Sequence, residues 1–526
     1  MTLSVLLAAI ALAQAAPAVD DGLYPITGTV TDAGSGRPLA RVRLTLALAT
    51  GGDQHFSAVT GANGSFAFRA PAGKYHLLGE RAGYPQQGLN QPPGSAFSTA
   101  VVAGSGKIAT DIAFRLVPGA AISGHVVDDA SDPVANAVVY ALRAGVFLGR
   151  RRVWHAGAAR TNGAGEYRLG AMPAGAYYIA VAAQPWFAEG LDLDEKTKEG
   201  DANIAWPLLF SGNTPDAHAA ALVTVTAGGE ANADFAFPAA RGSTLRFHTD
   251  SKEQTYFRVS LSQRGPDGCR LPYRNDTVYG GVMRNVYPGR YEFAAGSDSG
   301  TKAWLYRVMD VTGGDVDVDL SGLAAPTISG RVQVEGEKPK EGTLFQLGLQ
   351  DEIAHEGMRM VTRPDGTFDQ PLFLTGGRYR VGVAGGAYRV RSIQADGAKV
   401  EGTTIDLPEP GPLKLDVVIS DDVAKIEGML HRGKYPVAGA AAMLIPRERD
   451  GVSAEDQTDS DGSFNLASLP LGDYDLLILE TGEHIEYTRP EVLAPYREQL
   501  RPVHVGKRGV EKLDIDLDEP AARPAQ

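Results

Sequence analysis

A short motif that recurs along the chain constrains its fold more than any other feature. In its clearest form the motif spans 458–474 and reads TDSDGSFNLASLPLGDY. A turn at Asp461-Gly462 precedes alternating polar and apolar residues, and a second turn at Pro470 and Gly472 precedes an apolar run that begins at Tyr474. Alternation with a period of two is typical of a half-buried strand, and Gly and Pro are typical of tight turns. The motif therefore predicts a strand, a turn and a second strand.

The motif occurs five times, and each copy follows the glycine of an expected first strand at a similar distance. The copies end at tyrosines: Tyr75, Tyr177, Tyr291, Tyr379 and Tyr474. The corresponding glycines are Gly28, Gly124, Gly242, Gly330 and Gly428, so the separations run from 46 to 53 residues. The third copy is the most divergent. A period this regular indicates one structural unit repeated along the chain.

Composition supports β structure throughout. The 526 residues include 63 Gly and 32 Pro, yet 43% are hydrophobic, which suits many short strands joined by tight turns. Helical periodicity is nearly absent, with weak exceptions around 188–202 and 491–500. The fold class predicted is all-β, a string of about five domains with short linkers. The net charge of −13, without a Lys/Arg run that resembles a phosphate-tracking groove, argues against a nucleic-acid partner.

The repeat borders predict the domain organisation. We expect a signal peptide, five β-sandwich repeats and a disordered tail, at 1–15, 24–118, 119–238, 239–325, 326–420, 421–518 and 519–526. The second repeat carries a long insertion, 184–221, and the third is degenerate.

The N-terminus predicts export. Residues 2–15 are almost wholly apolar and end in Ala-Gln-Ala, a cleavage pattern, although no Lys or Arg precedes them. The alternative is a buried N-terminal segment. No later segment has the length needed to span a membrane. A single cysteine, Cys269, predicts that the domains are stabilised by packing without internal disulfides.

The repeated pattern resembles the carboxypeptidase regulatory-like domain. Its residues in the second copy are Gly124, Val126, Asp128, Pro133, Val134, Thr161, Gly165, Tyr167, Gly175 and Tyr177. The resemblance covers most of 26–517 and implies transthyretin-like β-sandwiches of about seven strands, related to starch-binding-like modules and pilin domains. It also implies exported proteins of environmental bacteria.

Catalytic motifs are not found in the sequence. The family name implies a zinc peptidase partner domain, but no histidine is followed three residues later by Glu, and His355-Glu356 has no second His. Nucleophile-elbow and phosphate-loop motifs are absent. We therefore predict no enzyme activity, no cofactor and no metal. The acidic alternation Asp315, Asp317 and Asp319 is interpreted as a solvated strand face, and Asp459 and Asp461 as turn formers, with metal binding as the alternative.

Three tryptophans are the candidate ligand-binding residues: Trp154, Trp186 and Trp206, all in the second copy. Indole faces are apolar and their edges polar, so exposed tryptophans can stack on sugar rings. The alternative is a small satellite core under the insertion, because Phe187, Leu208 and Leu209 accompany them.

These features predict a non-catalytic extracytoplasmic protein that binds or scaffolds, with a glycan or an envelope protein as partner. Carbohydrate binding follows by resemblance of fold alone. The alternatives are an accessory protein for a separate secreted peptidase or glycan hydrolase, and a mechanical spacer in the cell envelope. The sequence leaves open whether the protein is periplasmic, surface-bound or released.

Overall fold

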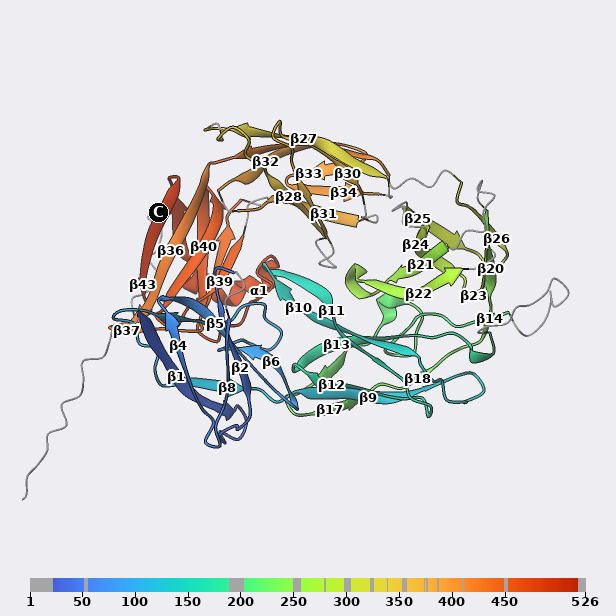
Figure 1. Cartoon of the computed structure of the whole chain (residues 1–526), viewed down its shortest axis with the longest axis horizontal. Helices are drawn as coiled ribbons and strands as arrows, with labels where there is room; N and C mark the ends of the chain where they lie inside the picture. Colours follow the sequence, from blue (N-terminus) through green and yellow to red (C-terminus); the bar gives the residue numbers. More distant parts are fainter. Residues whose placement is uncertain are drawn as a thin grey trace, which may run out of the picture.

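The computed structural model describes residues 22–51, 55–188, 203–248, 257–278, 281–297, 304–321, 326–337, 339–351, 357–372, 374, 377–385, 387–408, 411–448 and 453–518. The expected signal peptide and the expected C-terminal tail lie outside these residues. The regular secondary structure of the described part is almost entirely β-strand, arranged as successive pairs of packed sheets that we call units 1 to 5 (Figure 1). The predicted all-β fold of tandem β-sandwiches is confirmed.

One pairing scheme repeats in all five units. The first strand of each unit pairs antiparallel with the strand of the repeated motif and parallel with the last strand of the unit. The second strand lies in the opposite sheet, between the third strand and the strand that contains the motif tyrosine. Unit 3 keeps this scheme despite its divergent sequence.

Unit 1 pairs the sheet β4-β1-β8 with the sheet β3-β2-β5-β6, in which β5 also pairs with β7. Its strands are β1 (Leu23–Asp32), β2 (Arg43–Leu48), β3 (His55–Val59), β4 (Ser65–Pro71), β5 (Gly73–Arg81), β6 (Tyr84–Gly88), β7 (Ala100–Ala103) and β8 (Ile112–Leu116).

Unit 2 contains the strands β9 (Ala120–Val127), β10 (Val138–Phe147), β11 (Arg150–Arg160), β12 (Glu166–Met172), β13 (Gly175–Ala182), β15 (Leu209–Phe210), β16 (Val223–Val225), β17 (Glu230–Asn232) and β18 (Phe235–Ala236). β15 belongs to the predicted insertion but pairs with β13, so this part of the insertion extends the sheet. Short additional elements are η1 (Trp186–Ala188), β14 (Ile204–Ala205), η2 (Ala217–Ala219) and β19 (Ala240–Arg241).

Unit 3 contains β20 (Ser243–His248), β21 (Phe257–Arg264), η3 (Pro266–Gly268), β22 (Arg270–Val278), β23 (Val282–Val286), β24 (Gly289–Ser297), β25 (Trp304–Val311) and β26 (Val316–Asp319). Unit 4 contains β27 (Thr327–Glu335), β28 (Gln346–Asp351), β29 (Gly357–Val361), β30 (Thr367–Pro371), β31 (Gly377–Val383), β32 (Arg389–Asp396), β33 (Lys399–Glu401), β34 (Thr404–Leu407) and β35 (Leu413–Ser420).

Unit 5 contains β36 (Val423–Arg432), β37 (Tyr435–Pro436), β38 (Ala441–Pro446), β39 (Ala454–Gln457), β40 (Ser463–Pro470), β41 (Gly472–Leu479), β42 (Arg501–Val505) and β43 (Gly509–Asp516). A short helical stretch, α1 (Pro490–Leu493) followed by η4 (Ala494–Gln499), lies where the sequence shows weak helical periodicity. Within the described residues, no helix has both the length and the apolarity needed to cross a membrane.

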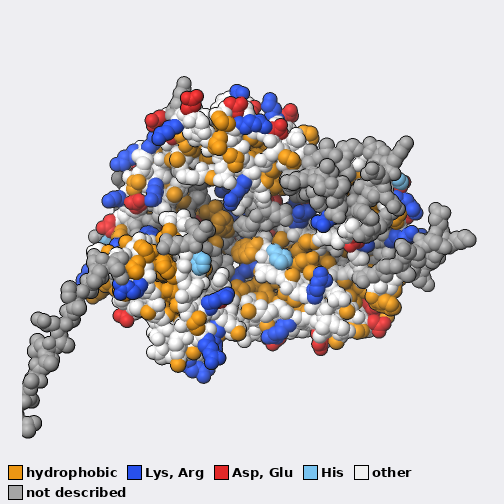
Figure 2. All heavy atoms as spheres, in the orientation of Figure 1, with side chains coloured by type: hydrophobic (Ala, Val, Ile, Leu, Met, Phe, Trp, Pro, Cys, Tyr) orange, Lys and Arg blue, Asp and Glu red, His pale blue; other side chains and the backbone are white. Residues whose placement is uncertain are grey.

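The string closes on itself. Figure 1 shows the five units arranged around a common centre, with unit 5 beside units 1 and 2. Turn 459–461 of unit 5 docks on β7, an edge strand of unit 1: Ser460 N–H donates to Ala100 O (2.9 Å) and Val102 N–H donates to Ser460 Oγ (2.9 Å). In the space-filling view, hydrophobic side chains are visible in the middle of the face, between the units (Figure 2).

Unit 5 also contacts unit 2. Thr488 Oγ1 donates to Gly149 O (2.6 Å), and Phe97 of unit 1 stacks against both Phe147 of unit 2 and His484 of unit 5, with ring centroids 6.2 and 4.4 Å apart. Units 1, 2 and 5 therefore meet at one junction of aromatic rings.

Candidate ligand-binding site

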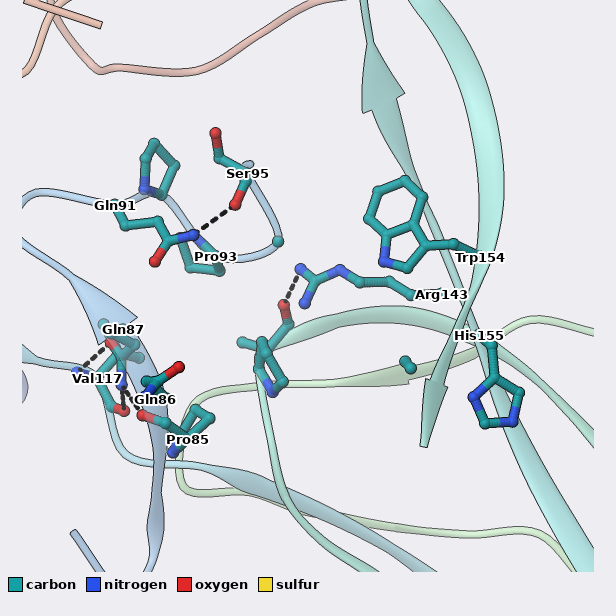
Figure 3. A pocket seen from close by; sticks show the side chains of 15 residues that line it. Pro85, Gln86, Gln87, Gln91, Pro93, Ser95, Val117, Arg143, Trp154 and His155 are labelled. Carbon is teal, nitrogen blue, oxygen red and sulfur yellow. Dashed lines mark hydrogen bonds between the residues drawn. The ribbon is translucent and has the colours of Figure 1, made fainter. Parts of the chain in front are cut away.

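A cavity of about 330 Å³ lies between unit 1 and unit 2. Unit 1 contributes the loop 91–95 and residues 85–87 of β6, whereas unit 2 contributes residues of β10 and β11 and the turn at Pro173 and Ala174 (Figure 3). This volume falls in the range of small-molecule sites, roughly 300–1,000 Å³. The site exists only because the two units are held together.

Trp154, a predicted ligand-binding residue, lines this cavity from β11. Its partner across the sheet is Arg143 of β10. The indole packs directly against Gly145, where an added Cβ would lie within 3.0 Å of the ring. Gly145 therefore leaves the space that the indole occupies, and the half-buried ring borders the cavity at the side shown in Figure 3.

The other two tryptophans lie elsewhere. Trp206 is 1% exposed in the core of unit 2 and stacks on Phe237, with centroids 4.9 Å apart. Trp186, in η1, is 73% exposed and contacts Phe187 edge-to-face. The three tryptophans therefore do not form one exposed face, because the indole of Trp206 is enclosed by core side chains. Trp206 therefore fills a core, which is the alternative to ligand binding that the sequence also offers for these tryptophans.

Arg143 is a residue of this site that the sequence alone did not identify. Its guanidinium lines the cavity although the residue is only 5% exposed. Nη2 donates to Ala174 O (2.8 Å) and Nη1 to Tyr177 Oη (3.2 Å). A signal was present in the sequence: Val139, Ala141 and Arg143 alternate on the inward face of β10, where a charge is out of place.

The acidic residues considered as metal ligands are engaged in ion pairs. Asp459 pairs with Lys74, and Asp461 Oδ2 lies 2.7 Å from Lys107 Nζ, so both bind unit 5 to unit 1. Asp461 also caps its own turn by accepting from Ser463 N–H (3.1 Å), as expected of a turn former. Among the described residues, no group of three or more His, Cys, Asp or Glu side chains is placed to hold a metal ion.

Asp315 and Asp317 lie on an exposed face, as the solvated-strand interpretation predicts. Asp315 pairs with Arg246 (2.9 Å) and Asp317 with His248 (2.9 Å). Cys269 is buried in the core that includes unit 3, in keeping with a packed thiol.

The fold and the site define a class: a multidomain β-sandwich protein with a ligand-sized cavity between two of its sandwiches. Residues 25–104, which form most of unit 1, match the family model of the carboxypeptidase regulatory-like domain. No curated protein matches this sequence.

Several solved structures of bacterial proteins share low similarity with the chain. The TIE protein of Bacillus anthracis is 10% identical with a TM-score of 0.17, and the match covers 95% of this chain and 75% of that one. BcpA, the major pilin subunit of Bacillus cereus, is 11% identical with a TM-score of 0.14 over 94% and 99%. The minor pilin GBS52 of Streptococcus agalactiae is 17% identical with a TM-score of 0.15 over 38% and 100%. TM-scores this low define no shared arrangement, so nothing about this chain follows from those proteins' roles.

Proposed function

We propose that the protein is an exported, non-catalytic binding protein whose ligand is a carbohydrate held between units 1 and 2. The observation that carries the proposal is the cavity of about 330 Å³ bordered by the half-buried indole of Trp154. An indole that is partly exposed in a concave site offers an apolar face to a sugar ring. Export is supported by the apolar segment 2–15 and its Ala-Gln-Ala pattern.

The proline rings that line the cavity beside Trp154 also suit a carbohydrate ligand. Pro85, Pro92, Pro93 and Pro173 line the cavity and give it further apolar surface without flexible side chains. Gln86 is exposed at the cavity and supplies an amide that can bond hydroxyl groups. A few polar groups within an apolar wall are typical of small-molecule sites.

The alternatives receive unequal support. A mechanical spacer needs an extended chain, and the docking of unit 5 on β7 of unit 1 speaks against that role. An accessory role beside a secreted peptidase or glycan hydrolase stays a second candidate, because, unlike a spacer, it does not require an extended chain.

A glycan array with three proteins tests the proposal. We expect wild-type protein to bind at least one glycan class, Trp154→Ala to lose that binding by tenfold or more, and Trp186→Ala to retain it. The last variant removes an exposed indole away from the cavity wall, so it is the matched control. Absence of glycan binding by wild type, or loss only in Trp186→Ala, would contradict the proposal.

A further inference from the structure

The cavity between units 1 and 2 contains a buried cation whose hydrogen-bond acceptors are both neutral. The two acceptors of Arg143 are a backbone carbonyl and a phenol, and its Cζ lies 5.6 Å from the ring centroid of Tyr177. No carboxylate of the described residues forms an ion pair with it. Burial lowers the pKa of the Arg143 guanidinium, which reflects the cost of holding this charge away from water. Buried charges in proteins are ordinarily paired.

The fold does not require a guanidinium at this position. The residue that faces the motif tyrosine across the sheet is Arg143 in unit 2, opposite Tyr177. In unit 1 the same place is taken by Leu48, and in unit 5 by Pro446. Two units therefore close around their tyrosine with an apolar residue, whereas unit 4 has the buried Asp351 opposite Tyr379. A guanidinium at this position is thus particular to unit 2 and is not a requirement of the shared fold.

Donors remain available on Arg143. A guanidinium carries five N–H groups in a planar fork, and two of them are used by Ala174 O and Tyr177 Oη. No further acceptor for Arg143 is found among the residues that the structure describes. Gly94 holds the loop of unit 1 close to this group: an added Cβ there would lie within 3.0 Å of Cζ, and its φ is +75°. The guanidinium is thus fixed at the wall where the two units meet.

The rest of the lining contains no acid. The residues around the cavity include Arg143, His155 and Trp154 but neither Asp nor Glu. Figure 3 shows the guanidinium and the indole on the same wall, opposite the loop with Pro93 and Ser95. A ligand with a carboxylate and an apolar ring face would pair with the first and stack on the second.

We propose that this cavity selects acidic sugars, with the carboxylate of a uronic acid unit bound by Arg143 and its ring against Trp154. The inference rests on the proposed function and names its ligand class. Carboxylate–guanidinium pairs are charge-assisted and can be bidentate, so they give strong and directional recognition. The unit could belong to a free sugar acid or to an acidic polysaccharide.

Calorimetric titration with matched sugars tests this inference. The probes are galacturonic acid, its oligosaccharides and the neutral galactose counterparts. We expect wild type to bind the acidic oligosaccharides at least tenfold more tightly than the neutral ones, with a preference that weakens at high salt. Arg143→Leu, which introduces the side chain that Leu48 has in unit 1, should abolish the preference while keeping the weak neutral binding. Binding of the monomer would identify a free sugar acid as sufficient, whereas binding only of oligosaccharides would assign a polymer.

Two controls separate the possible failures. Equal binding of acidic and neutral sugars by wild type would overturn the inference and leave the proposed function standing, whereas no binding of any sugar would overturn both. An acidic preference that survives in Arg143→Leu would remove Arg143 from recognition. Should that variant fold poorly, the thermal midpoint of wild type decides: acidic sugars should raise it more than neutral sugars at the same concentration, and an equal rise with both would contradict the inference.

Discussion

At the scale of single residues, the motif tyrosines show how one side chain stabilises each sandwich. All five are buried, with exposed fractions of 3% or less. In four of them the hydroxyl donates to the carbonyl four residues earlier, as Tyr474 does to Pro470 O (2.8 Å). Burial raises the pKa of Tyr474 to about 12. A conserved tyrosine near a strand start is buried and bonded to backbone in the same way in immunoglobulin-type sandwiches.

Asp456 in β39 makes a prediction about pH. Burial raises its pKa to about 6, although two backbone N–H groups, of Gln457 and Asn465, partly oppose this. The folded state therefore holds the proton more tightly than the unfolded chain, whose ordinary value is 3.8. This contribution to stability is present below pH 3.8 and is lost as the pH rises through 6. At neutral pH the loss amounts to at most roughly 3 kcal/mol.

The variant Asp456→Asn, which resembles the protonated acid, isolates this effect. We expect its urea midpoint, relative to that of wild type, to rise steadily between pH 4 and pH 7.5, because only wild type loses stability at this residue. Parallel pH profiles for the two proteins would show that Asp456 titrates normally in the folded state.

At the scale of elements, the first strands of units 1, 2, 4 and 5 each depend on a glycine. Gly330 of β27 lies so close to β35 that an added Cβ would fall within 3.0 Å of Leu415 O, and Gly28 and Gly124 likewise face a backbone carbonyl oxygen. At Gly428 the added Cβ would instead meet the ring of Phe464. This explains why the glycine recurs at a fixed distance from the motif tyrosine. The last strand of unit 4, β35, runs parallel to β27 and places Leu415 opposite Gly330. A glycine in a strand often marks such a close approach of another backbone.

Gly330→Ala should therefore destabilise unit 4 by roughly 1–3 kcal/mol, the usual cost of overpacking. Gly348→Ala in β28 is the matched control, because an added Cβ there meets no atom within 4 Å. We expect that variant to be neutral or more stable by about 0.5 kcal/mol. Limited proteolysis and urea unfolding report both effects, and equal behaviour of the two variants would refute the crowding argument.

The elements were largely predictable, whereas the binding site was only partly so. Alternating residues and Asx-Gly turns are local signals, and they place the motif strands where the structure has them, as at Gly462 with φ +78°. The cavity is formed by residues of two units, so no local pattern marks it. Trp154 can be identified from its residue type alone, whereas Arg143 is visible in the sequence only as a charged exception among the inward-facing apolar residues of β10.

At the scale of the whole molecule, closure depends on pairs that are distant in the sequence. Lys74 and Lys107 of unit 1 bind Asp459 and Asp461 of unit 5, and Ala100 N–H donates to Asp459 Oδ1 (3.3 Å). The turn covers an edge strand that would otherwise present unpaired backbone groups. In the sequence, Asp459 and Asp461 look like ordinary turn formers, and nothing nearby marks them as contacts with another unit. The short linkers therefore predict a string of domains but not that the string closes.

Closure also supports the proposed binding site. Gln457 Nε2 of unit 5 donates to Asn90 O (2.7 Å), next to the loop 91–95 that forms one wall of the cavity. Opening the contact between units 1 and 5 should therefore loosen this wall as well as lengthen the molecule.

Small-angle X-ray scattering tests closure most directly. If the whole chain formed a single globule, its radius of gyration would be about 24 Å, whereas five domains of about 100 residues in an extended string would have a radius of about 50 Å. We expect the radius of gyration of the wild-type protein to be below roughly 30 Å. Lys74→Glu with Lys107→Glu places like charges against Asp459 and Asp461 and should increase the radius. Lys399→Glu with Lys414→Glu makes the same charge change away from the contact and should not. A wild-type radius near that of the extended string, unchanged by either pair of substitutions, would contradict the closed arrangement.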